Sequence, residues 1–397
     1  MFYIKLKHLF ISLYTIFITH ILFALFAPNM GEESNFQFTT YMTEISTLGE
    51  FGLIHHLTSD MKMQNASTLR GVGDDCAVLN YSSDPSDNRR VLITTDMLME
   101  GIHFDLTYTP LKHLGYKAAM VNLSDVYAMN GTPRQLLVSI AMGRRMKVEH
   151  IDELYAGIRL ACERHGVDIV GGDTSSSLTG LAISITCIGE ANAEDIVYRS
   201  GANDTDLLCV SGNLGAAYMG LQLMEREKRI FESQKGNPET AAQPDFAGRE
   251  YLIERFLKPE ARRDIIRRLH EVGIRPTAMM DISDGLSSEA MHICHQSHTG
   301  CRIYEERIPI DYQTAVTAEE FNFNVYTAAL NGGEDYELLF TVPLTDHERI
   351  AQIEDVKVIG HITKPELGTK LITRDGNEFD LKAQGWNGFA EKEDENK

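Results

Sequence analysis

The length, composition and charge of the chain already exclude several classes of protein. With 397 residues, of which 43% are hydrophobic, the chain is long enough for two ordinary domains with apolar cores. Its 57 acidic residues outnumber its 37 basic ones, which gives a formal net charge of −20 and a pI near 5.1. This excess argues against binding to nucleic acid or to anionic membranes, and a phosphorylated ligand would have to bind together with cations.

The N-terminal residues and the cysteines give conflicting indications about where the protein resides. Residues 1–28 place two lysines ahead of a long apolar run, as a signal peptide or membrane anchor would. A second methionine, Met42, precedes a stretch in which a serine or threonine could cap a helix with Glu50 at capping-box spacing. We therefore expect translation to begin at Met42 and residues 1–41 to be an upstream extension, with a genuine anchor as the alternative. Six scattered cysteines without a CxxC pair favour a reduced, cytoplasmic protein.

The first half of the chain alternates between strand-like and helix-like runs, as an α/β domain with antiparallel strands would. Strands are predicted at 76–79, 91–95, 136–143 and 181–191. The spacing of apolar positions predicts helices from Leu114 to Met129 and over residues 150–166, and Asn122 and Asp125 should share one helix face. The stretch DIVGGDTS is expected to be a strand that runs into a turn. We place this first domain at residues 42–195.

The second half, residues 196–397, starts a new set of elements and is expected to form another α/β domain. Strands are predicted at 206–212, at the start of AMMDISDGL, over TAALNGGEDYELLFTV (327–342) and over VKVIGHI (356–362). Helices are predicted from NLGAAYMG onward, over 260–272 and after DISDG. Residues 225–250 are charged and polar with two prolines, so we expect a surface insertion there.

Acidic residues recur where these predicted elements meet Gly or Ser turns. The motifs are GVGDDCAV (71–78), TTDMLMEGIHF (94–104), NLSDVYAMNGTP (122–133), GGDTSS (171–176), DISDGL (281–286) and NGGEDYEL (331–338). Strand ends are where ligands gather in α/β folds, and Asp, Ser and Thr oxygens are hard ligands suited to Mg²⁺. Asp and Asn before Gly are also ordinary turn formers, but so many carboxylates near one sheet edge would repel one another without cations. The set therefore predicts a magnesium site that binds phosphate groups.

The common phosphate-binding motifs are missing from the chain. There is no GxxxxGK[ST] loop and no set of protein-kinase motifs. The glycines of GNLGAAYMG could open a helix terminus that faces a phosphate, and close helix packing explains them equally well. Arg199 is a candidate for binding a phosphate chain, with an ordinary surface arginine as the equal alternative.

Several other side chains are candidates for contacts with a substrate. His103 lies between apolar residues in GIHF, which by itself favours a core or turn histidine. Glu334 and Asp335 could act as an acid–base pair or orient a substrate. Trp386 or Phe389, in the late GWNGF stretch, could stack on a planar ring or anchor the C-terminal tail.

Taken in order, the acidic motifs closely resemble those of the thiamine-monophosphate kinase family, from about Met42 to Phe389. The resemblance implies a two-domain α/β (α+β) fold of the aminoimidazole ribonucleotide synthetase-like superfamily, with an N-terminal sheet domain that pairs in a homodimer. It also implies ATP bound with several Mg²⁺ ions between the domains. The implied reaction is ATP-dependent phosphorylation of thiamine monophosphate to thiamine diphosphate, by direct in-line transfer without a covalent nucleophile.

The resemblance also implies roles for individual residues. Its metal-binding positions correspond to Asp75, Thr94, Thr95, Asp96, Asp125, Asp173, Asp281 and Asp284. Its ATP-binding positions correspond to Gly172, Asp173, Arg199 and Ser283. The region that holds thiamine phosphate corresponds to His103, Glu334 and an aromatic residue, Phe389 or Trp386.

Two rival functions remain alternatives to this reaction. One is a sibling ATP-dependent enzyme of the same fold, such as a cycloligase that acts on a purine precursor. The motifs GIHF and GGEDYEL and the late aromatic stretch argue against it. The other is a non-catalytic protein that binds nucleotide or divalent cations, which the nearly complete acidic set disfavours. A membrane would be a partner only if the N-terminal extension is real.

Overall fold

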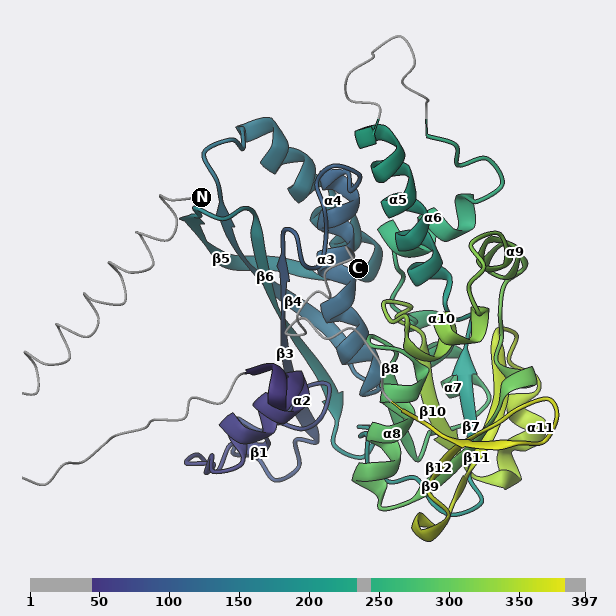
Figure 1. Cartoon of the computed structure of the whole chain (residues 1–397). Coiled ribbons are helices and arrows are strands. Elements are labelled where there is room, and N and C mark those ends of the chain that lie inside the picture. Colours follow the sequence, from purple (N-terminus) through teal and green to yellow (C-terminus); the bar gives the residue numbers. More distant parts are fainter. Residues whose placement is uncertain (1–44, 234–243, 383–397) are drawn as a thin grey trace, which may run out of the picture. The chain divides into compact units, whose positions relative to one another are not determined.

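The computed structural model describes residues 45–233 and 244–382, which form two β-sheets with helices packed against them (Figure 1). Both sheets belong to one compact unit of the chain, which begins at Leu48. The predicted mixed α/β fold class is therefore confirmed. None of the helices in the described ranges combines the length and apolar character needed to cross a membrane.

The predictions for residues 1–41 and for a start at Met42 stay predictions, because residues 1–44 lie outside the described ranges. Thr47, the threonine expected to cap a helix here, lies within the first described helix, α2 (Ile45–Thr58). The backbone leaves helical geometry at Gly49, with φ 65° and ψ −177°. A glycine tolerates this conformation because it has no Cβ atom.

The first sheet is built from the strands of residues 68–192. Its strands are β1 (Thr68–Arg70), β2 (Ala77–Leu79), β3 (Arg89–Met99), β4 (Thr132–Met142), β5 (Asp168–Ser176) and β6 (Ala182–Asn192). They lie in the order β1-β2-β3-β6-β4-β5, and all neighbours are antiparallel except β4 and β5. The whole GGDTSS motif is thus part of strand β5, which corrects the expected turn and makes this motif a sheet edge.

Two helices, α3 (Leu111–Ala128) and α4 (Val148–His165), pack together on one side of this sheet (Figure 1). Their close approach depends on two glycines. A Cβ atom on Gly115 would lie 1.9 Å from the carbonyl oxygen of Leu154, and one on Gly157 would lie 1.9 Å from that of Lys112. Helix α4 ends at Gly166, which has the left-handed conformation common at helix C-termini, as its sequence position predicts.

The second sheet contains the strands of residues 207–380. They are β7 (Leu207–Ser211), β8 (Ala278–Asp281), β9 (Gly300–Tyr304), β10 (Leu338–Val342), β11 (Val356–Thr363), β12 (Thr369–Ile372) and β13 (Glu378–Asp380). The order is β13-β12-β9-β11-β7-β10-β8, with β12 parallel to β9 and every other pair antiparallel. Sequence-distant strands therefore become neighbours, as β8 and β10 do.

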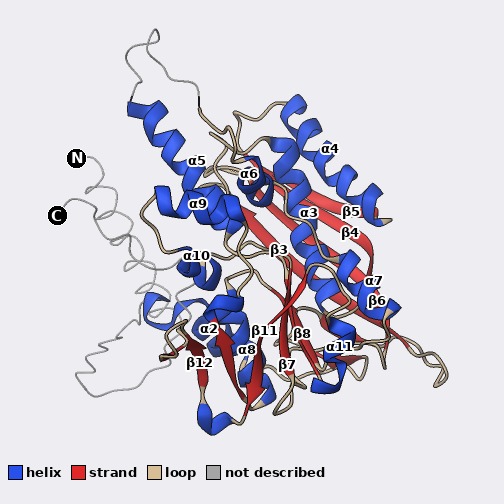
Figure 2. Ribbon diagram, turned by 90° about the vertical axis from the view of Figure 1, so that its right-hand side faces the viewer, coloured by secondary structure: helices blue, strands red, loops and turns tan. Residues whose placement is uncertain are grey.

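The described helices of the second half pack partly against this sheet and partly against one another (Figure 2). The α-helices are α5 (Ala216–Ser233), α6 (Glu250–Leu257), α7 (Arg263–Glu271), α8 (Leu286–Ser297), α9 (Tyr312–Glu320), α10 (Val325–Asn331) and α11 (His347–Ile350). Short 3₁₀ turns occupy Glu305–Arg307, Leu344–Asp346 and Pro365–Leu367.

Two predictions for the second half are wrong. Residues 327–331, expected to open a strand, belong to helix α10, and the strand β10 starts only at Leu338. The expected insertion at 225–250 begins instead with the last turns of α5, which runs to Ser233. The buried residues of α5 all lie before residue 225, so the charged residues that follow belong to a solvated end of this helix and not to a loop.

The apolar core runs through both sheets because strand side chains alternate between two faces. Met279 and Phe340 point into a core that they share with α3 and the first sheet. Their strand neighbours, Met280 and Leu339, point to the opposite face, where α8 covers them. The last turns of α3 also touch β8, so one helix reaches from the first sheet to the edge of the second.

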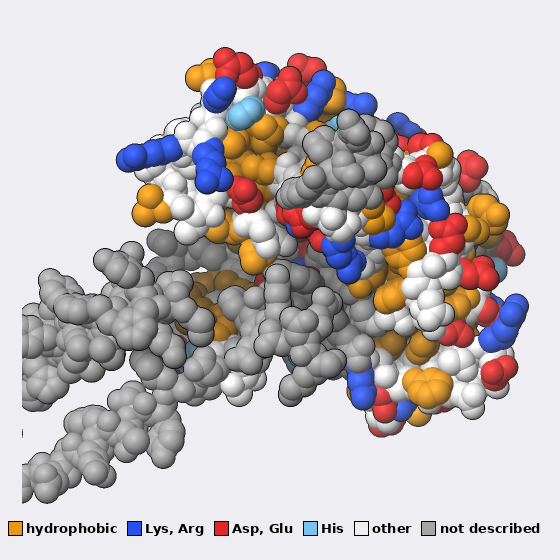
Figure 3. All heavy atoms as spheres, turned by 45° about the horizontal axis from the view of Figure 1, so that its top comes forward, with side chains coloured by type: hydrophobic (Ala, Val, Ile, Leu, Met, Phe, Trp, Pro, Cys, Tyr) orange, Lys and Arg blue, Asp and Glu red, His pale blue; other side chains and the backbone are white. Residues whose placement is uncertain are grey.

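On the face shown in Figure 3, lysine and arginine side chains are interspersed with aspartate and glutamate. Among the surface pairs are Arg249 with Glu320 and Arg134 with Glu190, at 2.6 and 2.9 Å. Exposed ion pairs of this kind contribute little to stability, so the shared core is the main source of cohesion.

Candidate active site

Three carboxylates from distant parts of the chain converge into one cluster. Asp75 precedes β2, Asp125 lies near the end of α3, and Asp281 is the last residue of β8. One oxygen from each side chain lies within 4.8 Å of the others. Asp75 and Asp281 are buried and Asp125 is half-buried. All three are positions that the sequence predicted for metal binding, and we call them the carboxylate cluster.

Hydrogen bonds fix the orientation of the cluster. The Thr94 hydroxyl donates to Oδ2 of Asp125, and the Ser124 hydroxyl donates to Oδ2 of Asp281, each at 2.5 Å. The side-chain oxygen of Asn122 accepts from the backbone N–H of Asp96 at 3.2 Å. Helix α3 thus touches β3 through Asn122 and β8 through Ser124, and it holds Asp125 between them.

The electrostatics of the cluster favour a bound cation. Burial raises the pKa of Asp75 to about 7 and that of Asp281 to about 6, and it raises the pKa of Asp125 well above its ordinary value. Burial, with repulsion from Asp75, also raises the pKa of Asp96 on β3 to about 6. Oxygen Oδ2 of Asp75 is buried and accepts no hydrogen bond from any described residue. These carboxylates are hard oxygen ligands that repel one another, and one of their buried oxygens lacks a hydrogen bond from a described residue. Both features fit the requirements of Mg²⁺.

Arg199 neutralises part of this charge in the structure. Its guanidinium donates to Oδ1 of Asp75 from Nη2 at 2.5 Å and from Nε at 3.0 Å. The backbone N–H of Arg199 donates to the neighbouring Asp74 at 2.7 Å, and Asp74 also pairs with Arg70. The two aspartates of the GDD motif therefore differ in role, because Asp74 holds the loop and Asp75 joins the cluster.

Not every predicted metal residue joins the cluster. Successive strand side chains point to opposite faces, so Thr94 and Asp96 face α3 while Thr95 faces away. The Thr95 hydroxyl donates to the carbonyl oxygen of Ile185 on β6 at 3.1 Å. The sequence motif TTD alone could not separate these neighbours without the strand register.

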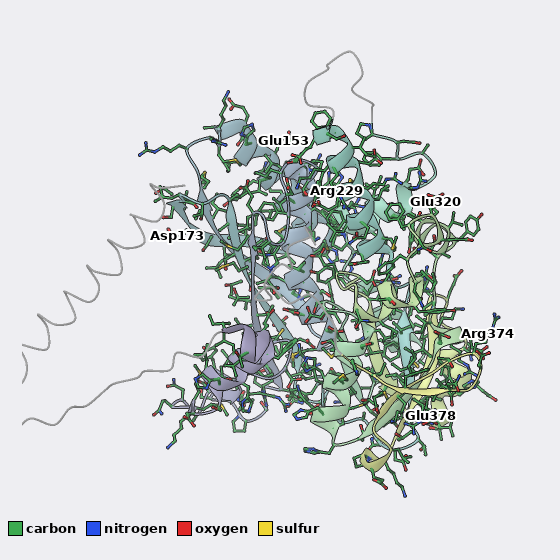
Figure 4. All side chains as sticks on the ribbon, in the orientation of Figure 1. Glu153, Asp173, Arg229, Glu320, Arg374 and Glu378 are labelled. Carbon is green, nitrogen blue, oxygen red and sulfur yellow. The ribbon has the colours of Figure 1, made fainter. Side chains whose placement is uncertain are left out.

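Gly172 and Asp173 lie on β5, which is three strands beyond β3 in the first sheet. Figure 4 labels Asp173 on this strand. A Cβ atom on Gly172, where φ is 156°, would lie 1.8 Å from the carbonyl oxygen of Val138, so only glycine allows this pairing with β4. Asp173 is exposed on the sheet edge. Within one chain the structure does not bring these two residues to the carboxylate cluster.

The DISDGL loop brings another acidic group toward the site. Burial raises the pKa of Asp284 to about 6, with further contributions from Glu50 and Glu334. Its backbone N–H donates to Glu289 at 3.0 Å, and this buried glutamate was missed by the sequence reading. The carbonyl oxygen of Ser283 accepts from the backbone N–H of Glu334 at 2.7 Å, which ties two of the acidic motifs together.

Of the residues predicted to bind the substrate, His103 and Glu334 lie in the described ranges. The Nδ1 atom of His103 accepts from the backbone N–H of Met99 at 3.0 Å, and burial lowers the pKa of His103. Glu334 pairs at 2.7 Å with Lys117, a buried lysine that the sequence reading did not single out. The residues around Lys117, KAAMVN, are typical of an ordinary helix. The only signal in the sequence is the spacing of eight residues, which places Lys117 and Asp125 on the same side of that helix.

The other members of the NGGEDYEL motif and the late aromatic residues belong elsewhere. Asp335, expected as a partner of Glu334, accepts from the backbone N–H of Gly215 at 2.7 Å, just before α5. Glu337 is buried against Arg255 and Arg262. These contacts give both acidic residues a structural role. Trp386 and Phe389 lie outside the described residues, so their predicted role stays a prediction.

The two sheets and the acidic site define a class of protein. Residues 73–191 match the family described as AIR synthase related protein, N-terminal domain. The crystal structure of hydrogenase maturation protein HypE in complex with ATP has a TM-score of 0.59 at 19% identity, and covers 85% of this chain and 96% of that one. At that identity the likeness shows a common fold.

Curated relatives narrow the class. Thiamine-monophosphate kinase of Aquifex aeolicus (strain VF5) is 34% identical, over 87% of this chain and 99% of its own length. That of Bacillus subtilis (strain 168) is 30% identical, over 86% of this chain and 100% of its own. The structure described as AaThiL complexed with AMPPCP and TMP has a TM-score of 0.73 at 32% identity, and covers 88% of this chain and all of that one. The chain belongs to the thiamine-monophosphate kinase family.

Proposed function

We propose that this chain transfers the γ-phosphoryl group of ATP to thiamine monophosphate, giving ADP and thiamine diphosphate. The observation that carries the proposal is the carboxylate cluster, in which one oxygen from each of three aspartates lies within 4.8 Å of the other two. In addition, the buried Oδ2 of Asp75 accepts no hydrogen bond from a described residue. The similar AaThiL structure holds AMPPCP and TMP, which supports the choice of both substrates.

In this proposal the cluster holds magnesium. Asp75, Asp125 and Asp281 would be ligands, with Asp96 and Asp284 nearby and Thr94 orienting Asp125. Bound Mg²⁺ would neutralise the phosphate oxygens, which otherwise repel a chain of charge −20. Arg199 is the cation placed to contact a phosphate chain, because it already contacts the cluster through Asp75.

The reaction needs no covalent nucleophile. The acceptor is a phosphate oxygen that is already anionic at neutral pH, so no strong base has to remove a proton from it. The protein's contribution is then to hold two anions in line and to exclude alternative orientations. We assign His103 and Glu334 to the thiamine end of the site, together with the Trp386 or Phe389 region.

We further propose a homodimer formed through the first sheet. All nine residues of β5 are exposed, among them Ile169 and Val170 at 36% and 57%. Among the described strands, β5 pairs with β4 alone. A long exposed edge strand readily pairs with another chain. Pairing there would also give Gly172 and Asp173 a place in the partner's site, which one chain alone does not offer them.

The remaining assignments follow from the same proposal. We assign residues 42–195 to ATP, metal and dimer contacts and residues 196–397 to the second domain, because the two sheets divide between them. A cytoplasmic location is supported by the six cysteines, all of which are buried free thiols.

Incubation of the purified full chain with ATP and MgCl₂, with and without thiamine monophosphate, tests the proposed reaction. We expect ADP and thiamine diphosphate in equal amounts, only when all components are present, as followed by chromatography. ATP binding without thiamine diphosphate would reject the reaction and redirect the search to substrates of the sibling cycloligases.

A further inference from the structure

The buried lysine Lys117 is the strongest feature that the proposed reaction does not yet use. Its side chain is only 3% exposed, on the face of α3 that carries Asp125 two turns later. The ammonium lies 2.7 Å from Oε2 of Glu334 and 3.3 Å from the carbonyl oxygen of Phe256, and 4.7 Å from the centre of the Phe256 ring. A buried charge needs such partners, and Glu334 is the one that carries the opposite charge.

Glu334 is held by its backbone as firmly as by its side chain. Its φ angle is 59°, and those of Gly333 and Tyr336 are 68° and 51°, a left-handed conformation that non-glycine residues rarely adopt. The N–H groups of Glu334 and Tyr336 donate to the carbonyl oxygens of Ser283 and Ile282, at 2.7 and 2.8 Å. A Cβ atom on Gly333 would lie 2.5 Å from the Ser283 oxygen, so this close contact requires glycine.

Within the described part of the chain, the Glu334 carboxylate has a hydrogen-bond partner at one of its two oxygens. Oε2 is occupied by Lys117, whereas Oε1 accepts no hydrogen bond from a described residue, and the side chain is 29% exposed. Lys117 and Asp125 are eight residues apart on α3, which is about 12 Å along a helix. A substrate with a phosphate group at the cluster would thus extend its organic end toward Glu334.

We propose that Lys117 is a positioning residue, which locks the Glu334 carboxylate so that Oε1 faces the cationic and amino-bearing rings of thiamine monophosphate. This role rests on the proposed function. Lys117 itself does not touch the substrate, and its charge also prevents Glu334 from turning toward metal ions at the cluster. The pair would therefore set the affinity for the substrate and leave the phosphoryl transfer itself unaffected.

Steady-state kinetics of Lys117→Met and Lys117→Arg separate this role from a structural one. We expect Lys117→Met to raise the KM for thiamine monophosphate by about tenfold or more, because the charged hydrogen bond that holds Glu334 in place is lost. The KM for ATP and kcat should change by less than about threefold. Lys117→Arg keeps the charge and should recover most of the affinity. Equal rises in both KM values, or a fall confined to kcat, would overturn the proposal.

A double-mutant cycle tests whether Lys117 acts through Glu334. Glu334→Gln should raise the same KM, and adding Lys117→Met to it should raise the KM by no more than about twofold further. Additive effects would mean that Lys117 acts independently. Tyr116→Phe is the matched control, because it removes the 2.7 Å hydrogen bond of the adjacent α3 residue to Glu260 and leaves Glu334 untouched. Its KM values should equal those of the wild type.

Titration calorimetry with thiamine monophosphate in the absence of ATP compares the dissociation constants of the wild type and the variants without turnover. We expect the dissociation constant to follow the KM, in all variants. Tight binding by the wild type without formation of thiamine diphosphate would reject the proposed function alone. Wild-type turnover with unchanged affinity in both Lys117→Met and Glu334→Gln would reject the positioning role alone. If Lys117→Met does not fold, Lys117→Arg and Glu334→Gln carry the test.

Discussion

The carboxylate cluster and the edge strand β5 carry similar acidic motifs but present them in opposite environments. Asp75 and Asp281 are buried, hydrogen-bonded and close to other carboxylates, so burial and repulsion shift their pKa values. Asp173 lies among nine exposed residues on a strand with one free edge. Motifs of similar composition can therefore lie in a buried cluster or on an exposed strand, and in the homodimer proposed above a second chain would cover that strand.

The largest effect is expected from Asp281→Asn in the cluster. The variant keeps the shape and the bond from Ser124 but loses a ligand charge, so kcat/KM should fall by about a hundredfold or more. Removing one of the three repelling charges of the cluster should raise the melting temperature in chelator. The matched variant Asp173→Asn, on the exposed strand, should leave the melting temperature unchanged. Activity of Asp281→Asn within about tenfold of the wild type would contradict the metal assignment.

Mixing two inactive variants tests whether β5 completes a partner's site. If Asp173 acts on the cluster of the other chain, Asp281→Asn and Asp173→Asn should complement each other after unfolding and refolding together. Random pairing would yield about a quarter of the wild-type activity, because about half of the dimers are mixed and each contains one intact site. A mixture that stays inactive, or a monomeric mass in solution, would show that the two residues do not share a site between chains.

The pH dependence of stability should be steeper without magnesium than with it. The pKa of Asp75 is raised from 3.8 to about 7 and that of Asp281 to about 6. Between about pH 4 and 7 the folded, metal-free chain holds protons that the unfolded chain has released, so the free energy of unfolding falls as the pH rises. Mg²⁺ displaces these protons, and its stabilising effect should grow over the same range.

Thermal melts at pH 5 and pH 8, in chelator and in MgCl₂, measure this dependence. Carboxylates with lowered pKa values elsewhere, such as Asp87, act in the opposite direction. The informative quantity is therefore the difference between the wild type and Asp281→Asn, in which these contributions cancel. A difference that does not change with pH would show that the cluster does not titrate in this range.

The smallest effect separates two neighbouring threonines of β3. Thr95→Val loses a hydrogen bond to Ile185 on the face away from α3, so activity should stay within about threefold of the wild type. Thr94→Val loses the bond that orients Asp125 and should reduce kcat/KM by about tenfold. Activity assays under identical magnesium concentrations compare the two. A larger loss in Thr95→Val would mean that this side chain has a role outside the single chain.

Much of the fold was predictable where local rules act without competition. The helices α3 and α4 follow from apolar spacing, and α4 also ends at the glycine Gly166. Most strands follow from β-branched runs. The errors at residues 225–233 and 327–331 arose where helices carry charged or small residues, which resemble loops and strands over short windows. The role of Lys117 was missed for a similar reason, since nothing local distinguishes it from a surface lysine.

The chemical character of the site can be predicted from the amino-acid sequence, because oxygen-rich motifs in a chain of charge −20 require cations to bind phosphate groups. Which of those oxygens meet depends on the packing of the folded chain. Ser124 and Asp281 are 157 positions apart, and they touch because α3 reaches the edge strand β8 of the other sheet. Strand register turned Thr95 away and topology placed Asp173 on a free edge. These outcomes depend on packing between distant segments, which no local pattern of residues encodes.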